Sequence, residues 1–258
     1  MPLLFTCVCN QPERLLSAIE PVREVLLTKD ITRWGLSYVQ AGEVLLSRHP
    51  KPIVGPFDFF EVLGSLSSDY VIGVATSDET YRGNANTQPF RYKHWMLGLQ
   101  DDIENFAVVH EALEAHLPGF LKRSVKGKSP AEYVLHVFLS LLHDAGQLDD
   151  HNLETKHSAA ALRTALTMVQ TACSDAGLAG KLGNVMVSNS RSTLAARLAG
   201  PMFQRRLKHV QDPKRPETEF RSVLVVSTES ALGEGFEELP PQSILCIRRD
   251  LSTDILPF

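Results

Sequence analysis

The stretch WMLGLQDDIEN, residues 95–105, marks the point where the chain changes from strand patterns to helix patterns. Apolar, β-prone runs precede it, and helical spacing of apolar residues follows it. Strand patterns occupy residues 2–9, the two halves of a hairpin around Ala41-Gly42, residues 69–76 and residues 92–99. Helical patterns occupy residues 10–27, 56–66, 103–117, 130–146 and 156–176.

Strand patterns return in the last third of the chain, at residues 184–190, 192–207, 220–228 and 242–250. No period of 20–50 residues repeats, and no composition shift marks a domain boundary. The order of strands, then helices, then strands predicts one α+β domain over residues 1–258, with sheets covered by helices.

Composition indicates an ordinary globular chain, because 43% of the 258 residues are hydrophobic and 22% are charged. The net charge of −4 gives no overall attraction to nucleic acid or acidic membranes. No apolar run is long enough to cross a bilayer, and the N-terminus lacks a signal-peptide pattern. Four cysteines are too few for a disulfide framework in a chain of this size. We therefore expect reduced thiols and a cytoplasmic location.

Several short motifs follow one another in a characteristic order. They are Asn10-Gln11-Pro12, Trp34-Gly35, GVATSDET at 73–80, NTQPF at 86–90, Leu99-Gln100-Asp101, VVSTES at 225–230 and LPPQSIL at 239–245. In this order they resemble the class II glutamine amidotransferases, which are N-terminal-nucleophile hydrolases. The most similar subgroup is the short stand-alone proteins like the ergothioneine-pathway amidohydrolase. The resemblance covers nearly the whole chain and implies a four-layer αββα sandwich of two stacked, mainly antiparallel sheets with helices outside.

The resemblance also implies a reaction that this chain lacks the residues to perform. The family places a nucleophilic Cys directly after the initiator Met, and this chain has Pro2 there. The family's arginine for the substrate α-carboxylate aligns with Ala75, and its oxyanion-hole Asn-Gly pair aligns with Gln100 and Asp101. The family's acid for the substrate amine aligns with Pro130, two residues before a retained Glu132.

Five altered positions in one pocket favour a catalytically inactive protein that acts by binding, as a regulatory or scaffolding subunit. The alternative is an active enzyme with changed chemistry in the same cleft. Its reactive group would be the Pro2 amine, Asp101 or Asp102, or a nucleophile shifted to Cys7 or Cys9. We favour small core residues for these two cysteines, because free Cys is commonly buried.

Candidate binding residues follow from the same comparison. If the altered cleft holds a ligand, the candidates are Trp34, Arg82, Asn86, Thr87, Gln88 and Asp102. We expect no cofactor and no metal, since the His/Glu patterns of the helices are typical of solvated faces. Residues 204–221 are basic and could dock a protein partner through Arg205, Arg206, Lys208, Lys214 and Arg215. They lack the interleaved aromatic residues of a single-strand nucleic-acid platform, and we expect no nucleic-acid partner.

Overall fold

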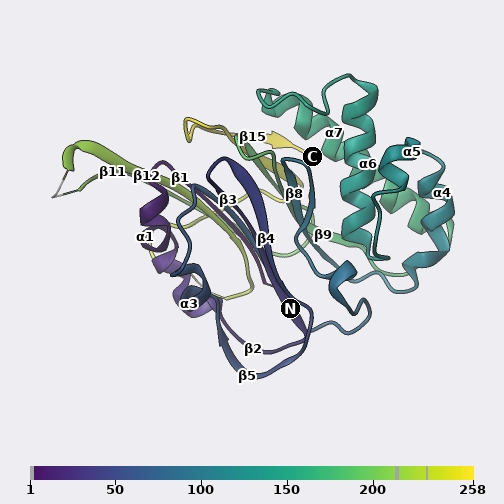
Figure 1. Cartoon of the computed structure of the whole chain (residues 1–258), viewed down its shortest axis with the longest axis horizontal. Coiled ribbons are helices and arrows are strands. Elements are labelled where there is room, and N and C mark those ends of the chain that lie inside the picture. Colours follow the sequence, from purple (N-terminus) through teal and green to yellow (C-terminus); the bar gives the residue numbers. More distant parts are fainter. Residues whose placement is uncertain (1–2, 213–214, 231) are drawn as a thin grey trace.

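The computed structural model describes residues 3–212, 215–230 and 232–258, with the side chains of 209–218 left out of the description. Two large sheets dominate this part of the chain, and every pairing between neighbouring strands is antiparallel. The two sheets stack on each other, with helices on the outer faces (Figure 1).

The first sheet is built mostly from the two ends of the sequence. Its strands, in order across the described sheet, are β13 (Glu237–Glu238), β11 (Met202–Asp212), β12 (Arg215–Ser227), β1 (Leu3–Cys9), β6 (Tyr70–Thr76), β3 (Arg33–Gln40) and β4 (Glu43–His49). The hairpin of β11 and β12 extends beyond the rest of this sheet (Figure 1). The predicted hairpin at Ala41-Gly42 is confirmed as the β3–β4 turn, where both residues have positive φ.

The second sheet comes from the middle and the C-terminal part of the chain. Its strands, in order, are β15 (Thr253–Pro257), β14 (Ser243–Ile247), β10 (Thr193–Arg197), β9 (Leu182–Ser188), β8 (Trp95–Asp101) and β7 (Phe90–Tyr92). A small separate sheet pairs β2 (Leu27–Ile31) with β5 (Ile53–Asp58).

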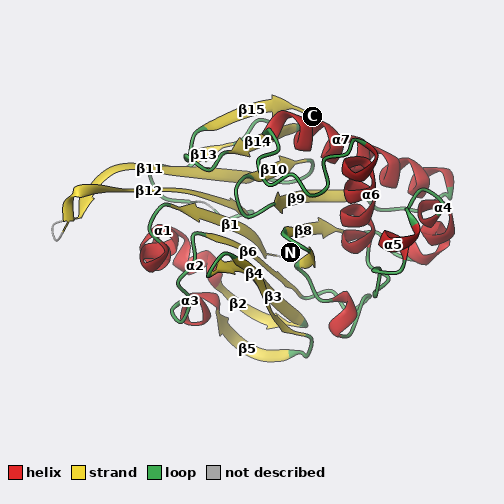
Figure 2. Cartoon of the chain, turned by 45° about the horizontal axis from the view of Figure 1, so that its top comes forward, coloured by secondary structure: helices red, strands yellow, loops and turns green. Residues whose placement is uncertain are grey.

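Helices lie on both outer faces (Figure 2). One group contains α1 (Leu15–Ile19), α2 (Arg23–Leu26) and α3 (Phe59–Leu63), with the 3-10 turns η1 (Pro12–Arg14) and η2 (Glu20–Val22). The other contains α4 (His110–Glu114), α5 (Gly119–Lys122), α6 (Pro130–Asp144) and α7 (Thr155–Asp175), preceded by η3 (Asn84–Asn86) and η4 (Phe106–Val109).

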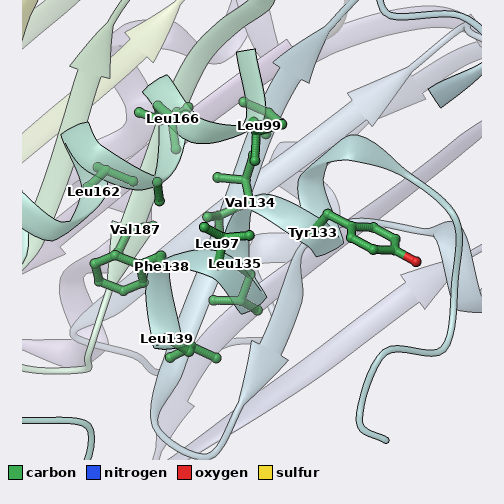
Figure 3. Packing of buried hydrophobic residues seen from close by; sticks show 14 of the residues in the cluster. Leu97, Leu99, Tyr133, Val134, Leu135, Phe138, Leu139, Leu162, Leu166 and Val187 are labelled. Atoms are coloured by element: carbon green, nitrogen blue, oxygen red, sulfur yellow. The ribbon is translucent and has the colours of Figure 1, made fainter. Parts of the chain in front are cut away.

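Three apolar clusters hold the layers together. One packs α6 and α7 against the second sheet, where Leu97, Leu99 and Val187 meet helix residues such as Phe138 and Leu162 (Figure 3). The second packs α1 and α3 on the outer face of the first sheet. The third fills the space between the sheets. The predicted four-layer αββα sandwich is therefore confirmed.

The helix expected over residues 10–27 is interrupted. It divides into η1, α1, η2 and α2, and Leu27 already belongs to β2. Pro21 lies inside η2, and a proline at an interior position removes a backbone donor and clashes with the preceding turn. The helices expected over 130–146 and 156–176 are confirmed as α6 and α7.

The central strands run from one end of the sandwich to the other. β1 begins at Leu3, β3 begins at Arg33 and β6 ends at Thr76, and the cross-strand pairs Leu3↔Ala75 and Arg33↔Thr76 place these termini together. We call this the Leu3 end, and β8 finishes there at Asp101. The opposite termini of these strands form what we call the Cys9 end. Strands of seven residues separate the two ends by about 20 Å.

Candidate functional site

A small pocket lies at the Leu3 end, close to where the motif residues gather. Its volume is about 20 Å³, which is room for roughly one water molecule. The residues that line it are Arg33, Val74, Thr76, Asp78, Tyr81, Asn86, Gln88, Leu99, Asp101 and Ser129. Three of the predicted site residues, Asn86, Gln88 and Asp101, are among them.

Arg33 provides the cation of this pocket. Its side chain is only 7% exposed, and its guanidinium donates to the backbone oxygen of Asp78 at 3.1 Å and to Oδ2 of the same residue at 3.2 Å. Asp78 Oδ1 also accepts from the backbone N–H and hydroxyl of Thr80, at 2.9 and 2.6 Å. Burial opposes ionisation of Asp78, but these hydrogen bonds and the Arg33 cation lower its pKa below the usual value.

Asp101 is a second carboxyl group near the same cation. Burial and the neighbouring Asp78 carboxylate raise its pKa to about 7, although Arg33 opposes the change. Asp101 is therefore partly protonated near neutral pH. A carboxyl group in this state can donate or accept a proton, as acid–base catalysis requires.

Gln88 has a structural role at the pocket wall. Its side-chain amide donates from Nε2 to the backbone oxygen of Leu99 at 2.9 Å and accepts at Oε1 from the Leu99 N–H at 2.8 Å. The side chain thus takes the place of a neighbouring strand beside β8. These hydrogen bonds leave Gln88 little capacity to bind a ligand.

The other polar residues of this loop also bind the protein itself. Asn86 accepts from the Lys128 N–H at 2.6 Å and donates to the Arg82 backbone oxygen at 2.9 Å. The hydroxyl of Thr87 donates to the Gly83 oxygen at 3.0 Å. Arg82 is exposed, pairs with Glu79 and does not line the pocket, so it does not reach back toward the Ala75 position.

Trp34 and Ala75 face the opposite side of the first sheet. They are direct cross-strand partners, and both lie in the apolar cluster beneath α1 and α3. The assignment of Ala75 to the arginine position of the pocket was wrong, because alternate residues of a strand point to opposite faces. Val74 and Thr76 line the pocket instead, and Arg33 lines it in place of Trp34.

Gln100 and Pro130 also lie outside the pocket lining. Gln100 Oε1 accepts from the Ser227 hydroxyl at 2.8 Å in the space between the sheets. Pro130 is the buried first residue of α6, and the preceding Ser129 lines the pocket with a buried hydroxyl that has no partner among the described residues. Glu132 accepts from the N–H groups of Lys126 and Gly127, at 2.8 and 2.5 Å.

The remaining candidates for reactive groups differ in their surroundings. Asp102 lies at the surface, where its carboxylate accepts from the Lys181 N–H. Cys7 and Cys9 are buried in the outer apolar cluster of the first sheet. Burial raises the pKa of Cys7, and it raises that of Cys9 to about 12, so both thiols are protonated and poorly nucleophilic. Pro2 lies outside the described residues.

The basic hairpin predicted as a docking arm is formed by β11 and β12. The guanidinium of Arg205 lies over the Phe236 ring, 5.6 Å from its centre, and Arg206 pairs with Glu237 at 3.2 Å. Lys208 is exposed. Lys214 lies outside the described residues, and Arg215 is described only as the first backbone position of β12.

The lining residues that were not predicted as site residues are Arg33, Val74, Thr76, Asp78, Tyr81, Leu99 and Ser129. One signal could have identified Arg33: it directly precedes Trp34, the first residue of a predicted strand, and neighbouring residues of a strand point to opposite faces. Asp78 lies within the GVATSDET motif, but the sequence alone does not show that its carboxylate forms an ion pair with Arg33. Among the described residues, no group of three or more His, Cys, Asp or Glu side chains could hold a metal ion.

Solved structures with the same fold are class II glutamine amidotransferase-like proteins. A glutamine aminotransferase class-II domain protein from Silicibacter pomeroyi superposes with a TM-score of 0.64 at 16% identity, covering 99% of both chains. A predicted glutamine amidotransferase from Pseudomonas aeruginosa gives 0.55 at 14% identity, covering 100% of this chain and 96% of the other.

The glutamine phosphoribosylpyrophosphate amidotransferase of B. subtilis gives a TM-score of 0.60 at 14% identity. The match covers 99% of the present chain but 49% of that enzyme. No protein-family profile and no curated protein sequence matches the chain. The protein thus has the N-terminal-nucleophile hydrolase fold of the class II glutamine amidotransferases. In the described residues, no helix combines the length and apolar character needed to cross a membrane.

Proposed function

We propose that this protein is a catalytically inactive form of the class II glutamine amidotransferase fold, which acts by binding as a regulatory or scaffolding subunit. The observation that carries the proposal is the volume of about 20 Å³ left at the Leu3 end. Glutamine has ten heavy atoms and needs far more room than the single water that fits there. The Arg33–Asp78 pair and the Gln88–Leu99 hydrogen bonds occupy the polar groups that a substrate would need.

The chemistry of the surrounding residues supports the same proposal. Pro2 has no side-chain nucleophile. Asp101 stands where the resemblance places the oxyanion-hole glycine, and an ionised carboxylate would oppose the negative charge of the tetrahedral intermediate. Arg33 could pair with a substrate carboxylate, but Asp78 already accepts from it.

The test is glutamate release from glutamine by the purified protein and by Pro2→Cys, with Pro2→Ala as the matched control. We expect no release above the buffer blank from any of the three, because the new thiol would still lack a substrate pocket and an oxyanion hole. Intact-mass measurement must first show that Met1 has been removed from the Pro2→Cys protein. Steady turnover by the wild type, or turnover gained with Pro2→Cys, would contradict the proposal.

The proposed partner is a protein, and the basic β11–β12 hairpin is the candidate surface. A pull-down from the native host with the wild type should enrich a partner that mass spectrometry identifies. The triple variant Arg205→Gln, Arg206→Gln, Lys208→Gln should lose most of that enrichment. A second triple variant, Arg23→Gln, Lys29→Gln, Lys51→Gln, removes the same charge elsewhere and should retain it. Equal enrichment with both variants would exclude the hairpin.

A second candidate function is an enzyme that uses Asp101 as an acid–base group. The pKa of about 7 favours it, because catalytic groups are commonly tuned near the working pH. Its substrate would have to enter by displacing the Arg33–Asp78 pair, since the pocket has no room beside it.

A further inference from the structure

A far larger cleft opens at the Cys9 end of the sandwich, remote from the small pocket. Its volume is about 1090 Å³, against about 20 Å³ at the Leu3 end. Its walls come from the turns that join β3 to β4, β7 to β8, β9 to β10 and β14 to β15, together with the segment after α6. Both sheets therefore contribute to this cleft, which is large enough for a small-molecule ligand.

Three arginines in the lining have no carboxylate partner within ion-pair distance among the described residues. Arg91 donates to the Val44 backbone oxygen, and Arg191 donates to the neutral Asn152 side chain at 3.0 Å. The Arg249 side chain makes no hydrogen bond or ion pair in the described part of the chain. Burial raises the pKa of Asp69, and the nearby positive charge of Arg249 partly offsets that rise. These guanidinium groups retain donors for an added anion.

The remaining charges of the lining leave a small positive excess. Lys93 is already neutralised by Asp149 at 2.7 Å. Glu43 and Asp69 are the other carboxylates, so four cations face three acids. The chain as a whole carries −4. The local charge is thus opposite in sign to that of the whole molecule, which favours an anion at this place.

Two histidines, His94 and His151, also line the cleft. The rings of His94 and His151 lie 4.1 Å apart, centre to centre. Burial and the neighbouring His151 lower the pKa of His94 to about 4, so its imidazole is neutral at physiological pH. Its Nε2 is buried and has no partner among the described residues. A buried polar atom without a hydrogen-bond partner is costly.

The turn that carries Arg191 is held in place before any ligand binds. Asn189 Oδ1 accepts from the Arg191 N–H at 3.1 Å and from the Ser192 N–H at 2.8 Å. The hydroxyl of Tyr70 donates to the Arg191 backbone oxygen at 2.8 Å. Such preorganisation lowers the entropy lost when an anion binds.

We propose that the cleft at the Cys9 end binds a small molecule bearing a phosphate group, through Arg91, Arg191 and Arg249. The three guanidinium groups come from three separate places: Arg91 from β7, Arg191 from the β9–β10 turn and Arg249 from the β14–β15 turn. A tetrahedral phosphate can offer a different oxygen to each, whereas a planar carboxylate has two. An adjoining hollow of about 390 Å³ shares His151, Arg191 and Arg249 with the cleft and provides room for the rest of the molecule.

Calorimetric titration with inorganic phosphate, phenyl phosphate and phenylacetate tests the proposal. We expect saturable binding of both phosphates, with phenyl phosphate the tighter because its ring adds contacts in the cleft. Phenylacetate should bind at least about tenfold more weakly than phenyl phosphate, since it loses one charge-assisted hydrogen bond. Equal binding of phenylacetate, or no saturable binding of either phosphate, would overturn the proposal.

Two substitutions locate the binding. Arg191→Gln and Arg249→Gln should each weaken phenyl phosphate binding about tenfold. Arg23→Gln removes the same charge from α2 and should leave the affinity unchanged. Wild-type affinity in both cleft variants would overturn the assignment of the site.

NMR of the wild type gives an independent readout. Phenyl phosphate should shift the ring-proton signals of His94 and His151. Unmoved signals would also count against the site. Glutaminase activity plays no part in these measurements, so they are independent of the inactive-enzyme proposal.

Discussion

Two carboxyl groups compete for one guanidinium at the Leu3 end. Arg33 pairs directly with Asp78, whose pKa is lowered, while the pKa of Asp101 is raised to about 7 by burial and by Asp78. The folded protein therefore prefers Asp101 in its protonated form. The free energy of unfolding should fall as the pH rises from about 4, the unfolded pKa of an Asp, to about 7.

Asp101→Asn tests this dependence, because asparagine imitates the protonated acid. Between about pH 5 and pH 8, the wild type should lose about 2–3 kcal/mol more of its unfolding free energy than the variant does. Denaturant titration at both pH values measures the difference. Asp102→Asn changes the neighbouring surface residue and should follow the wild type. Parallel pH profiles for the wild type and Asp101→Asn would show that Asp101 ionises freely in the fold.

The face to which Ala75 points can be tested separately. Ala75→Arg would place a cation in the apolar cluster beneath α1 and α3, which should cost at least about 3 kcal/mol of stability. Thr76→Arg puts the same side chain one residue further, toward the carboxyl groups of Asp78 and Asp101, and should cost about 1 kcal/mol or less. Thermal melting ranks the two variants. A larger loss of stability for Thr76→Arg than for Ala75→Arg would show that Ala75 faces the pocket.

At the scale of elements, β1 and β6 approach closely around one glycine. Gly73 pairs with Phe5, and a Cβ added to Gly73 would overlap the Phe5 ring. We expect Gly73→Ala to destabilise the protein by about 1–3 kcal/mol, because the ring must leave its place in a packed core. Gly233→Ala is the matched control, since a Cβ there meets nothing within 4 Å. Similar unfolding midpoints for the two variants would contradict the packing described here.

The elements themselves were largely predictable, whereas the contents of the pocket were not. Continuous apolar, β-prone runs identified β1 and β6, whose residues are buried on both faces. Apolar residues at helical spacing identified α6 and α7, because burial of one helix face imposes that period on the sequence. The motif comparison assigned Trp34 and Ala75 to the pocket, but the residues that face it are their neighbours in the chain: Arg33, Val74 and Thr76. Which face of a strand meets the pocket depends on its pairing register, and a one-residue error moves every side chain to the other face.

Other features had no local signal in the sequence at all. The cleft at the Cys9 end combines Arg91 of β7 with Arg191 and Arg249 of two turns, and these three residues are far apart in the chain. The Gln88 side chain beside Leu99 depends on the path of a whole loop. The small β2–β5 sheet was not predicted: β2 begins at the last residue of the helix expected over 10–27, and β5 runs into the first residues of the helix expected over 56–66. These arrangements follow from tertiary contacts and not from local periodicity.

At the scale of the whole molecule, we expect the described layers to unfold together as the single domain predicted for residues 1–258. The chain has two tryptophans, and they report on different layers: Trp34 in the outer cluster of the first sheet, and Trp95 in the cluster beneath α6 and α7. Trp34→Phe and Trp95→Phe each leave one reporter. The fluorescence transitions of the two variants should coincide with their own far-UV circular dichroism transitions in urea. Separated transitions would indicate two domains.

The antiparallel strands that join the Leu3 end to the Cys9 end have a consequence for evolution. The described residues at the two ends share strands, but about 20 Å of buried strand keeps their side chains apart. Substitutions that close one end therefore leave the turns of the other end free to keep or gain a role. A lineage could lose an ancestral reaction at one end of the sandwich while selection continued to act on the other, and the shared core would preserve the fold throughout.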